Sequence, residues 1–140
     1  MKLHIVARGR IGRGPEADLV ARYEKRIVWP FMVTELPESG GRVADPLTPV
    51  KTIALDEGGT ALTSVALAKL LEEWRDSGIR EARFLIGAAD GLTTAERASA
   101  DKVLSFGTAT WPHLMVRAML CEQLYRATTI IAGHPYHREG

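Results

Sequence analysis

The chain has 140 residues, of which 46% are hydrophobic and 25% charged, so one compact domain is expected and a second has little room. The 18 basic and 17 acidic residues leave a formal charge of +1, which disfavours a polybasic mode of nucleic-acid binding. No apolar run approaches the roughly 20 residues of a membrane-spanning helix. A single cysteine excludes an internal disulfide framework. We expect one soluble, cytoplasmic domain over residues 1–140.

Strands and helices are predicted to alternate along the first half of the chain. Residues 3–7 are predicted as a strand that is largely apolar on both faces. A helix is predicted to begin at Pro15, since proline is tolerated in a first helical turn, and residues 31–36 form the next strand. Three prolines and a Gly-Gly pair make residues 37–49 the best candidate for a mobile loop.

The second half continues the alternation. Residues 52–55 are predicted as a short buried strand that ends at the turn 56–59, and Ser64 as the N-cap of the next helix, which Gly78 ends. A strand over 82–86, a short helix over 94–100 and a strand over 102–105 follow. A long helix spans 113–131 and is apolar on nearly all sides, so we expect a second subunit to cover one side.

This order of elements predicts an α/β domain with a mostly parallel sheet and helices on both faces. Ligands of such sheets bind beyond the carboxyl ends of the strands. Three predicted loops meet that condition: residues 55–59, 87–91 and 106–112. They are the first place to look for a binding site.

The turn 9–14 carries glycines in the order Gly-x-x-Gly-x-Gly, which is not the dinucleotide-binding fingerprint. No phosphate-loop lysine follows either, so a small nucleotide-binding regulator is disfavoured. The simpler interpretation is a solvated turn with basic residues. The functional one is that Arg8, Arg10 and Arg13 contact phosphates.

Candidate nucleophiles and acid–base pairs are scarce. No Gly-x-Ser-x-Gly elbow and no evident pair of catalytic carboxylates occurs. Cys121 lies among apolar residues of the long helix and is predicted to be a buried, inert thiol. His113 follows a proline at the start of that helix, where a capping or packing role is expected.

The C-terminal tail gathers His134, Tyr136, His137 and Arg138 within the last seven residues. Chain ends are usually frayed and solvated, which is the simpler interpretation. A proline between His134 and Tyr136 stiffens the segment and favours a functional role. Two histidines without further ligands give weak support for a metal, so no metal site is predicted.

Three stretches together carry a resemblance to a known family. They are residues 85–92 (LIGAADGL), residues 111–117 (WPHLMVR), and residues 122–127 (EQLYRA) leading into 134–139 (HPYHRE). With these motifs the chain resembles the ribosomal RNA large subunit methyltransferase H family, a branch of the SPOUT superfamily of knotted methyltransferases. The resemblance covers essentially the whole chain, and it implies a parallel sheet with a C-terminal trefoil knot.

The resemblance also implies an activity. Members of the family are homodimers that transfer a methyl group from S-adenosylmethionine to N3 of a pseudouridine in 23S rRNA of the assembled ribosome, without a metal or a membrane. Two alternatives remain open. One is a SPOUT enzyme that modifies transfer RNA, and the other is a non-catalytic, ribosome-associated RNA-binding protein.

Cofactor-binding positions implied by the resemblance fall on the three strand-end loops, at Leu55, Gly87, Phe106, Gly107, Thr108, Ala109, Thr110 and Trp111. Ala88 stands where a second glycine is common, which narrows the approach to the cofactor. The N3–H of the base is weakly acidic, so a proton acceptor is needed. Our hypothesis assigns this role to His137 of the partner's tail, with Tyr136 and Arg138 orienting the base or a phosphate.

Overall fold

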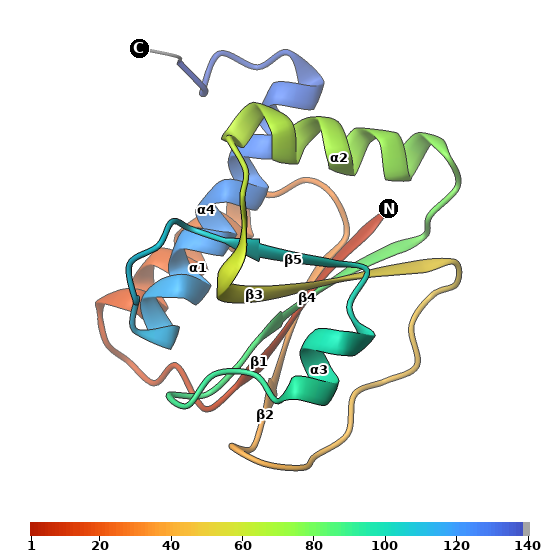
Figure 1. Cartoon of the computed structure of the whole chain (residues 1–140). Helices are drawn as coiled ribbons and strands as arrows, with labels where there is room; N and C mark the ends of the chain where they lie inside the picture. The colour runs from red at the N-terminus through yellow and green to blue at the C-terminus, as the bar shows by residue number, and fades with distance from the viewer. Residues whose placement is uncertain (139–140) are drawn as a thin grey trace.

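The computed structural model describes residues 1–138, which form five parallel strands and four helices (Figure 1). The elements in chain order are β1 (Lys2–Arg8), α1 (Pro15–Arg26), β2 (Phe31–Leu36), β3 (Val50–Ala61), α2 (Ser64–Asp76), β4 (Glu81–Ile86), α3 (Thr94–Ser99), β5 (Lys102–Ser105) and α4 (His113–Ala132). The strands lie in the order β2-β1-β4-β3-β5, and every pair is parallel. The predicted α/β class with a parallel sheet is confirmed.

Helices cover both faces of the sheet, as predicted, but unequally. On one face α4 packs between α1 and α2, and on the other lies the short helix α3 (Figure 1). Arg8 of β1 points to this second face, where its guanidinium lies 3.5 Å from the carboxylate of Glu96 in α3. The second face is therefore covered by one helix of six residues and by the irregular segment 37–49.

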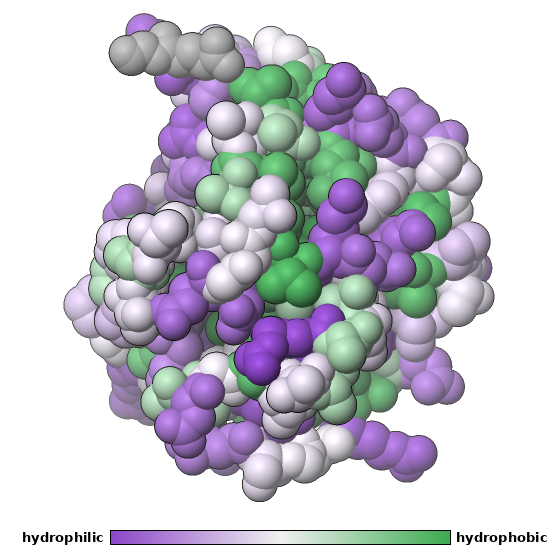
Figure 2. Space-filling view, viewed as in Figure 1, coloured by the Kyte–Doolittle hydropathy of each residue, from purple (hydrophilic) through white to green (hydrophobic). Residues whose placement is uncertain are grey.

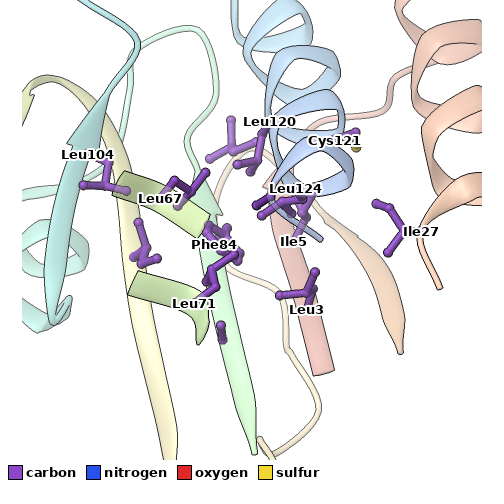
Figure 3. Packing of buried hydrophobic residues seen from close by; sticks show 14 of the residues in the cluster. Leu3, Ile5, Ile27, Leu67, Leu71, Phe84, Leu104, Leu120, Cys121 and Leu124 are labelled. Atoms are coloured by element: carbon purple, nitrogen blue, oxygen red, sulfur yellow. The ribbon is translucent and has the colours of Figure 1, made fainter. Parts of the chain in front are cut away.

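The hydrophobic core lies between the sheet and α4. Leu3 and Ile5 of β1 and Phe84 of β4 are completely buried, and they face Leu120 and Leu124 of α4 (Figure 3). Burying a side chain of this size stabilises a fold by roughly 1.5–3 kcal/mol. Because α4 begins just after the carboxyl end of β5, this packing fixes the start of α4 beside the carboxyl edge of the sheet.

Strand β3 is longer than predicted. The expected end at the turn 56–59 is wrong, because the chain resumes pairing with β5 after that turn. Leu104 of β5 is the partner of both Leu55 and Thr60, so residues 56–59 form a bulge that loops out between two paired stretches. The bulge places four residues at the carboxyl edge of the sheet.

The predicted N-cap of α2 is also wrong by one residue. Thr63 caps the helix, since its Oγ1 accepts a hydrogen bond from the amide of Ala66 at 3.0 Å. Ser64 instead donates to the side-chain oxygen of Gln123 in α4 at 2.7 Å. The two adjacent hydroxyl groups thus make different contacts: that of Thr63 caps the start of α2, and that of Ser64 links α2 to α4.

Segment 37–49 has no regular secondary structure, yet polar groups of the sheet attach it to the second face. Arg8 Nη1 donates to the carbonyls of Pro37 and Gly40 at 2.9 and 2.8 Å. Further along, the amide of Leu47 donates to the buried carboxylate of Glu81 at 3.3 Å. Hydrogen bonds to side chains of the sheet therefore hold the segment near both of its ends.

The helices in residues 1–138 include none long and apolar enough to cross a membrane. The same residues contain no group of three histidine, cysteine or carboxylate side chains arranged to hold a metal ion. Strand order and pairing do not test the trefoil knot, which stays a prediction.

Candidate functional site

A cavity of about 700 Å³ lies at the carboxyl ends of β3, β4 and β5 and is closed on one side by the first turn of α4. Its size is within the range of small-molecule sites. The three strand-end loops named from the sequence all reach it. Seven of the implied cofactor positions line it, namely Leu55, Gly87, Phe106, Gly107, Ala109, Thr110 and Trp111. Thr108 is exposed and does not line it.

The loop after β4 forms one wall of the cavity as a tight turn. The amide of Gly91 donates to the carbonyl of Ala88 at 2.8 Å, and Gly91 has a φ of +80°. A Cβ on Gly87 would lie 2.3 Å from the backbone carbon of Gly91, so only glycine fits. This turn leaves backbone instead of side chains beside the cavity at Gly87.

The β3 bulge forms another part of the cavity wall. Asp56 Oδ2 accepts from the amide of Gly58 at 3.0 Å, and Asp56 Oδ1 lies 3.7 Å from the guanidinium of Arg97. A Cβ on Gly59 would lie 2.7 Å from the backbone of Val103 in β5, so glycine is required where the bulge passes this strand. These contacts hold the bulge in a defined conformation.

Charged side chains give the cavity an acidic character. Asp56, Glu57 and Asp90 line it, against one guanidinium, that of Arg97, and the imidazole of His113. Three carboxylates beside a single arginine attract a ligand that carries positive charge. No phosphate-binding array of basic side chains is found among these lining residues.

A second cavity of about 350 Å³ adjoins the first and shares Leu55, Leu104 and Phe106 with it. Its walls also include Leu67 and Leu120 from α2 and α4. In Figure 2, hydrophobic side chains form a patch that runs from the top of the molecule to its centre, between hydrophilic side chains. The two cavities together offer a polar and an apolar compartment at the same edge of the sheet.

Residues 134–138, the part of the C-terminal tail that the structure describes, do not line the cavity of their own chain. The hydroxyl of Tyr136 donates to Glu122 Oε1 at 3.0 Å, and its ring contacts that of Tyr125 with centroids 4.6 Å apart. Arg126 lies 4.8 Å above the Tyr136 ring and 3.1 Å from His137 Nδ1. Burial, together with its hydrogen bonds with Tyr23 and to the Glu122 carboxylate, raises the pKa of Tyr136, so its phenol is neutral.

A groove between α1 and α4 connects the tail with the cavity. It is lined by Phe106, which also lines the cavity, and by Glu122, which binds the tail. Leu19 of α1 and Met115 of α4 each expose 38% of their surface in it. The long helix is therefore uncovered along one apolar side in a single chain.

Arg97 and His113 line the cavity but lie outside the three predicted loops, and Glu57 lies in the predicted loop 55–59 without having been singled out there. Glu57 and Arg97 have no motif that marks them, and His113 was expected to cap or pack. The imidazole of His113 lines the cavity. Its Nε2 also lies close to Gly9, 3.7 Å from the position that a Cβ on that glycine would take. The one available signal for His113 was its place directly after a strand-end loop.

The arginines of the turn 9–14 and its strand differ in their surroundings. The guanidinium of Arg8 hydrogen-bonds segment 37–49 and lies beside the carboxylate of Glu96, whereas Arg10 and Arg13 are exposed. The exposed pair is available to a charged partner.

Comparisons with known proteins agree with this geometry. A family model described as a predicted SPOUT methyltransferase matches residues 1–137. Among curated relatives, the protein of Erythrobacter litoralis is 65% identical over 140 residues and that of Sphingopyxis alaskensis is 66% identical, each covering all of this chain and at least 99% of the relative. Both relatives are named ribosomal RNA large subunit methyltransferase H.

Solved structures share the fold at low sequence identity. A probable methylase family protein from Haemophilus influenzae superposes with a TM-score of 0.60 at 13% identity, covering 99% of this chain and 70% of that one. A probable methyltransferase from Bordetella pertussis gives 0.59 at 14% identity, with coverages of 89% and 95%. From the full-length family match and the high identity of its relatives, the chain belongs to the SPOUT methyltransferase family, in the group named ribosomal RNA large subunit methyltransferase H.

Proposed function

We propose that this protein methylates N3 of a pseudouridine in 23S rRNA of the assembled ribosome, with S-adenosylmethionine as the methyl donor and a homodimer as the active form. One observation carries the proposal. Loops far apart in the sequence, which the family resemblance names as cofactor loops, line a single cavity at the carboxyl edge of the sheet. The names of the relatives support large-subunit rRNA as the substrate.

The chemistry of the two adjoining cavities suits this methyl donor. S-adenosylmethionine carries a sulfonium cation, an ammonium group and a carboxylate, so its net charge is positive, which the carboxylates of Asp56 and Asp90 favour electrostatically. The apolar compartment beside Leu67 and Leu120 suits a heteroaromatic base. Residues on this chain thus fit both ends of the cofactor.

Methyl transfer from a sulfonium is an in-line displacement that supplies an electrophilic methyl group and needs no metal. The contribution of the protein is alignment of the donor with the nitrogen of the base. We assign the holding of the donor to Leu55, to the backbone at Gly87 and to the loop 106–111. The exposed Arg10 and Arg13 are available to rRNA phosphates near the turn 9–14.

A homodimer formed on the α1–α4 groove completes the site. The groove reaches from Phe106 at the cavity to Glu122 at the tail, so a partner seated on it brings its own tail beside the cavity. Covering Leu19 and Met115 also removes apolar surface from water. The dimer thereby supplies the base-binding groups that the cavity of one chain lacks.

In the dimer, His137 of the tail accepts the N3 proton while Tyr136 and Arg138 orient the base or a phosphate. A neutral imidazole has one ring nitrogen with a lone pair, which can take a proton. The neutral phenol of Tyr136 acts as a hydrogen-bond donor, as it does toward Glu122 in the single chain. The near-neutral net charge of the chain favours binding to a shaped ribosomal surface rather than to free RNA.

The test is to incubate the protein with labelled S-adenosylmethionine and assembled ribosomes that lack the modification, and to map the labelled nucleotide by mass spectrometry. We expect one methyl group on a pseudouridine of 23S rRNA and none on bulk transfer RNA. Label in transfer RNA instead would favour the other SPOUT activity. No calorimetric heat with the methyl donor and no label would indicate a non-catalytic binding protein.

A further inference from the structure

Two loops that line the large cavity are joined by one short hydrogen bond. Thr110 Oγ1, in the loop between β5 and α4, donates to Glu57 Oε2, in the β3 bulge, at 2.5 Å. Both side chains line the cavity, and both are exposed to solvent. The bond joins two residues that are 53 positions apart in the sequence.

We propose that Glu57 is a positioning residue of the methyl-donor site, because its bond to Thr110 fixes the distance between the β3 bulge and the loop 106–112 at the cavity. This inference rests on the proposed function, since it assigns the cavity to the donor. Glu57 acts here through geometry: it fixes a loop, and the loop contacts the donor.

The bulge provides a firm support for this bond. The Asp56 carboxylate binds the amide of Gly58 at 3.0 Å and lies 3.7 Å from the guanidinium of Arg97. Gly59 passes so close to β5 that no larger residue fits. The backbone on both sides of Glu57 is thereby fixed, so its carboxylate has a defined position.

The loop 106–112, by contrast, is held mainly through bonds within itself. The indole of Trp111 donates to the carbonyl of Phe106 at 3.3 Å, and the amide of Gly107 bonds Ser105 Oγ at 3.3 Å. Gly107 has a φ of +104°, which other residues rarely adopt. The bond from Thr110 therefore links this loop to the β3 bulge. Less conformational entropy of the loop is then lost when the donor binds.

Breaking the bond from either side is expected to weaken donor binding equally. In Glu57→Ala and in Thr110→Val, the Kd for S-adenosylmethionine should rise roughly three- to tenfold, the range that corresponds to one net hydrogen bond. The double variant should be no weaker than the single ones, because both remove the same interaction.

A conservative variant separates geometry from charge. Glu57→Gln retains a side-chain oxygen that can accept from Thr110 but removes the negative charge, so its Kd should stay within about twofold of wild type. Glu73→Ala, which removes an exposed glutamate of α2 outside the cavity, is the matched control and should bind as wild type does. Thermal unfolding of the ligand-free variants should be unchanged, since both partners are exposed.

The measurement is isothermal titration calorimetry of the intact protein with S-adenosylmethionine. Glu57→Gln binding as weakly as Glu57→Ala would overturn the proposal, because charge alone would then account for the loss. Additive losses in the double variant, or wild-type affinity in both single variants, would also overturn it. Failure of the wild-type protein to bind the donor would instead refute the proposed cofactor site itself.

Discussion

Arg117 of α4 and Glu35 of β2 form an ion pair in which the guanidinium Nη1 lies 2.5 Å from the carboxylate Oε2. Arg117 Nη2 also donates to the carbonyl of Gly9 at 3.0 Å, and the amide of Ile11 donates to the same Glu35 oxygen at 2.8 Å. Arg117 is buried, whereas Glu35 is partly exposed. One side chain of α4 thereby holds the turn 9–14 and the carboxyl end of β2 against α4.

Removing the carboxylate should destabilise the protein more than neutralising it. Glu35→Ala leaves the buried guanidinium of Arg117 without its anion, so the free energy of unfolding should fall by about 2–3 kcal/mol, less than for a fully buried pair. Glu35→Gln keeps an acceptor and should lose about 1 kcal/mol. Urea unfolding at one fixed protein concentration measures both. Equal losses in the two variants would show that the negative charge is not what Arg117 requires.

The buried His4–Glu81 pair predicts a loss of stability in acid. Burial lowers the pKa of His4 below its usual 6.5, so the unfolded chain binds a proton there that the folded protein resists. Burial acts to raise the pKa of Glu81, but hydrogen bonds from Arg83 and the Leu47 amide outweigh it and lower that pKa below 4.5. Stability is therefore complete above about pH 6.5 and falls as the pH falls, first through His4 and then through Glu81.

The contribution of His4 is measured with His4→Gln, whose amide can still bond Thr34, the residue 2.7 Å from His4 Nε2. Unfolding free energies between about pH 6.5 and pH 5 should then change with a slope smaller by up to about 1.36 kcal/mol per pH unit, the slope of one proton. His134→Gln, at an exposed histidine, is the control and should keep the wild-type slope. A wild-type slope in His4→Gln would contradict the assignment.

Cys121 should be inert toward thiol reagents in the native protein. It is completely buried, and burial raises the pKa of its thiol to about 12. At pH 8 the reactive thiolate is then on the order of one molecule in ten thousand. Labelling with a chromogenic disulfide should be slow in buffer and prompt in denaturant, where one thiol per chain reacts. Prompt native labelling would mean that α4 opens at this position.

Local patterns explain how much of the fold the sequence predicts. The apolar run around Leu3 and Ile5 places β1 correctly, and α4 ends one residue beyond the predicted 113–131, at Gly133 with a φ of +74°. The continuation of β3 was not predictable in this way, because it depends on the pairing of Thr60 with Leu104 across the sheet. The choice of Thr63 over Ser64 as N-cap likewise depends on a distant residue of α4.

The site was predictable where topology alone determines it. The carboxyl-end rule selected the loops that contain Leu55, Gly87 and Phe106, and these residues line one cavity. The rule does not say which side chains cross between loops, so the bond of Glu57 to Thr110 had no sequence signal. The contact of the tail with Glu122 is equally a matter of tertiary packing.

Deleting residues 136–140 should abolish methylation, by at least about 100-fold, the lower end of what acid–base groups contribute. The Kd for the methyl donor should stay within about twofold, because no tail residue described here lines the cavity of its own chain. Ribosome methylation and donor calorimetry on the same preparation provide the two measurements. Normal methylation by the truncated protein would rule out the tail as the source of the proton acceptor.

Charging the α1–α4 groove should separate the proposed dimer and stop methylation together. Leu19→Asp and Met115→Asp each place a carboxylate on apolar surface that the partner would bury, which is costly without a counter-charge. Sedimentation equilibrium should show the wild type as a dimer and both variants as monomers that still bind the methyl donor. Val28→Asp alters an apolar side chain that is 88% exposed and outside the groove, so it should leave the dimer and the activity intact. A monomeric wild type, or dimeric and active groove variants, would show that the partner's tail completes the site by another surface or not at all.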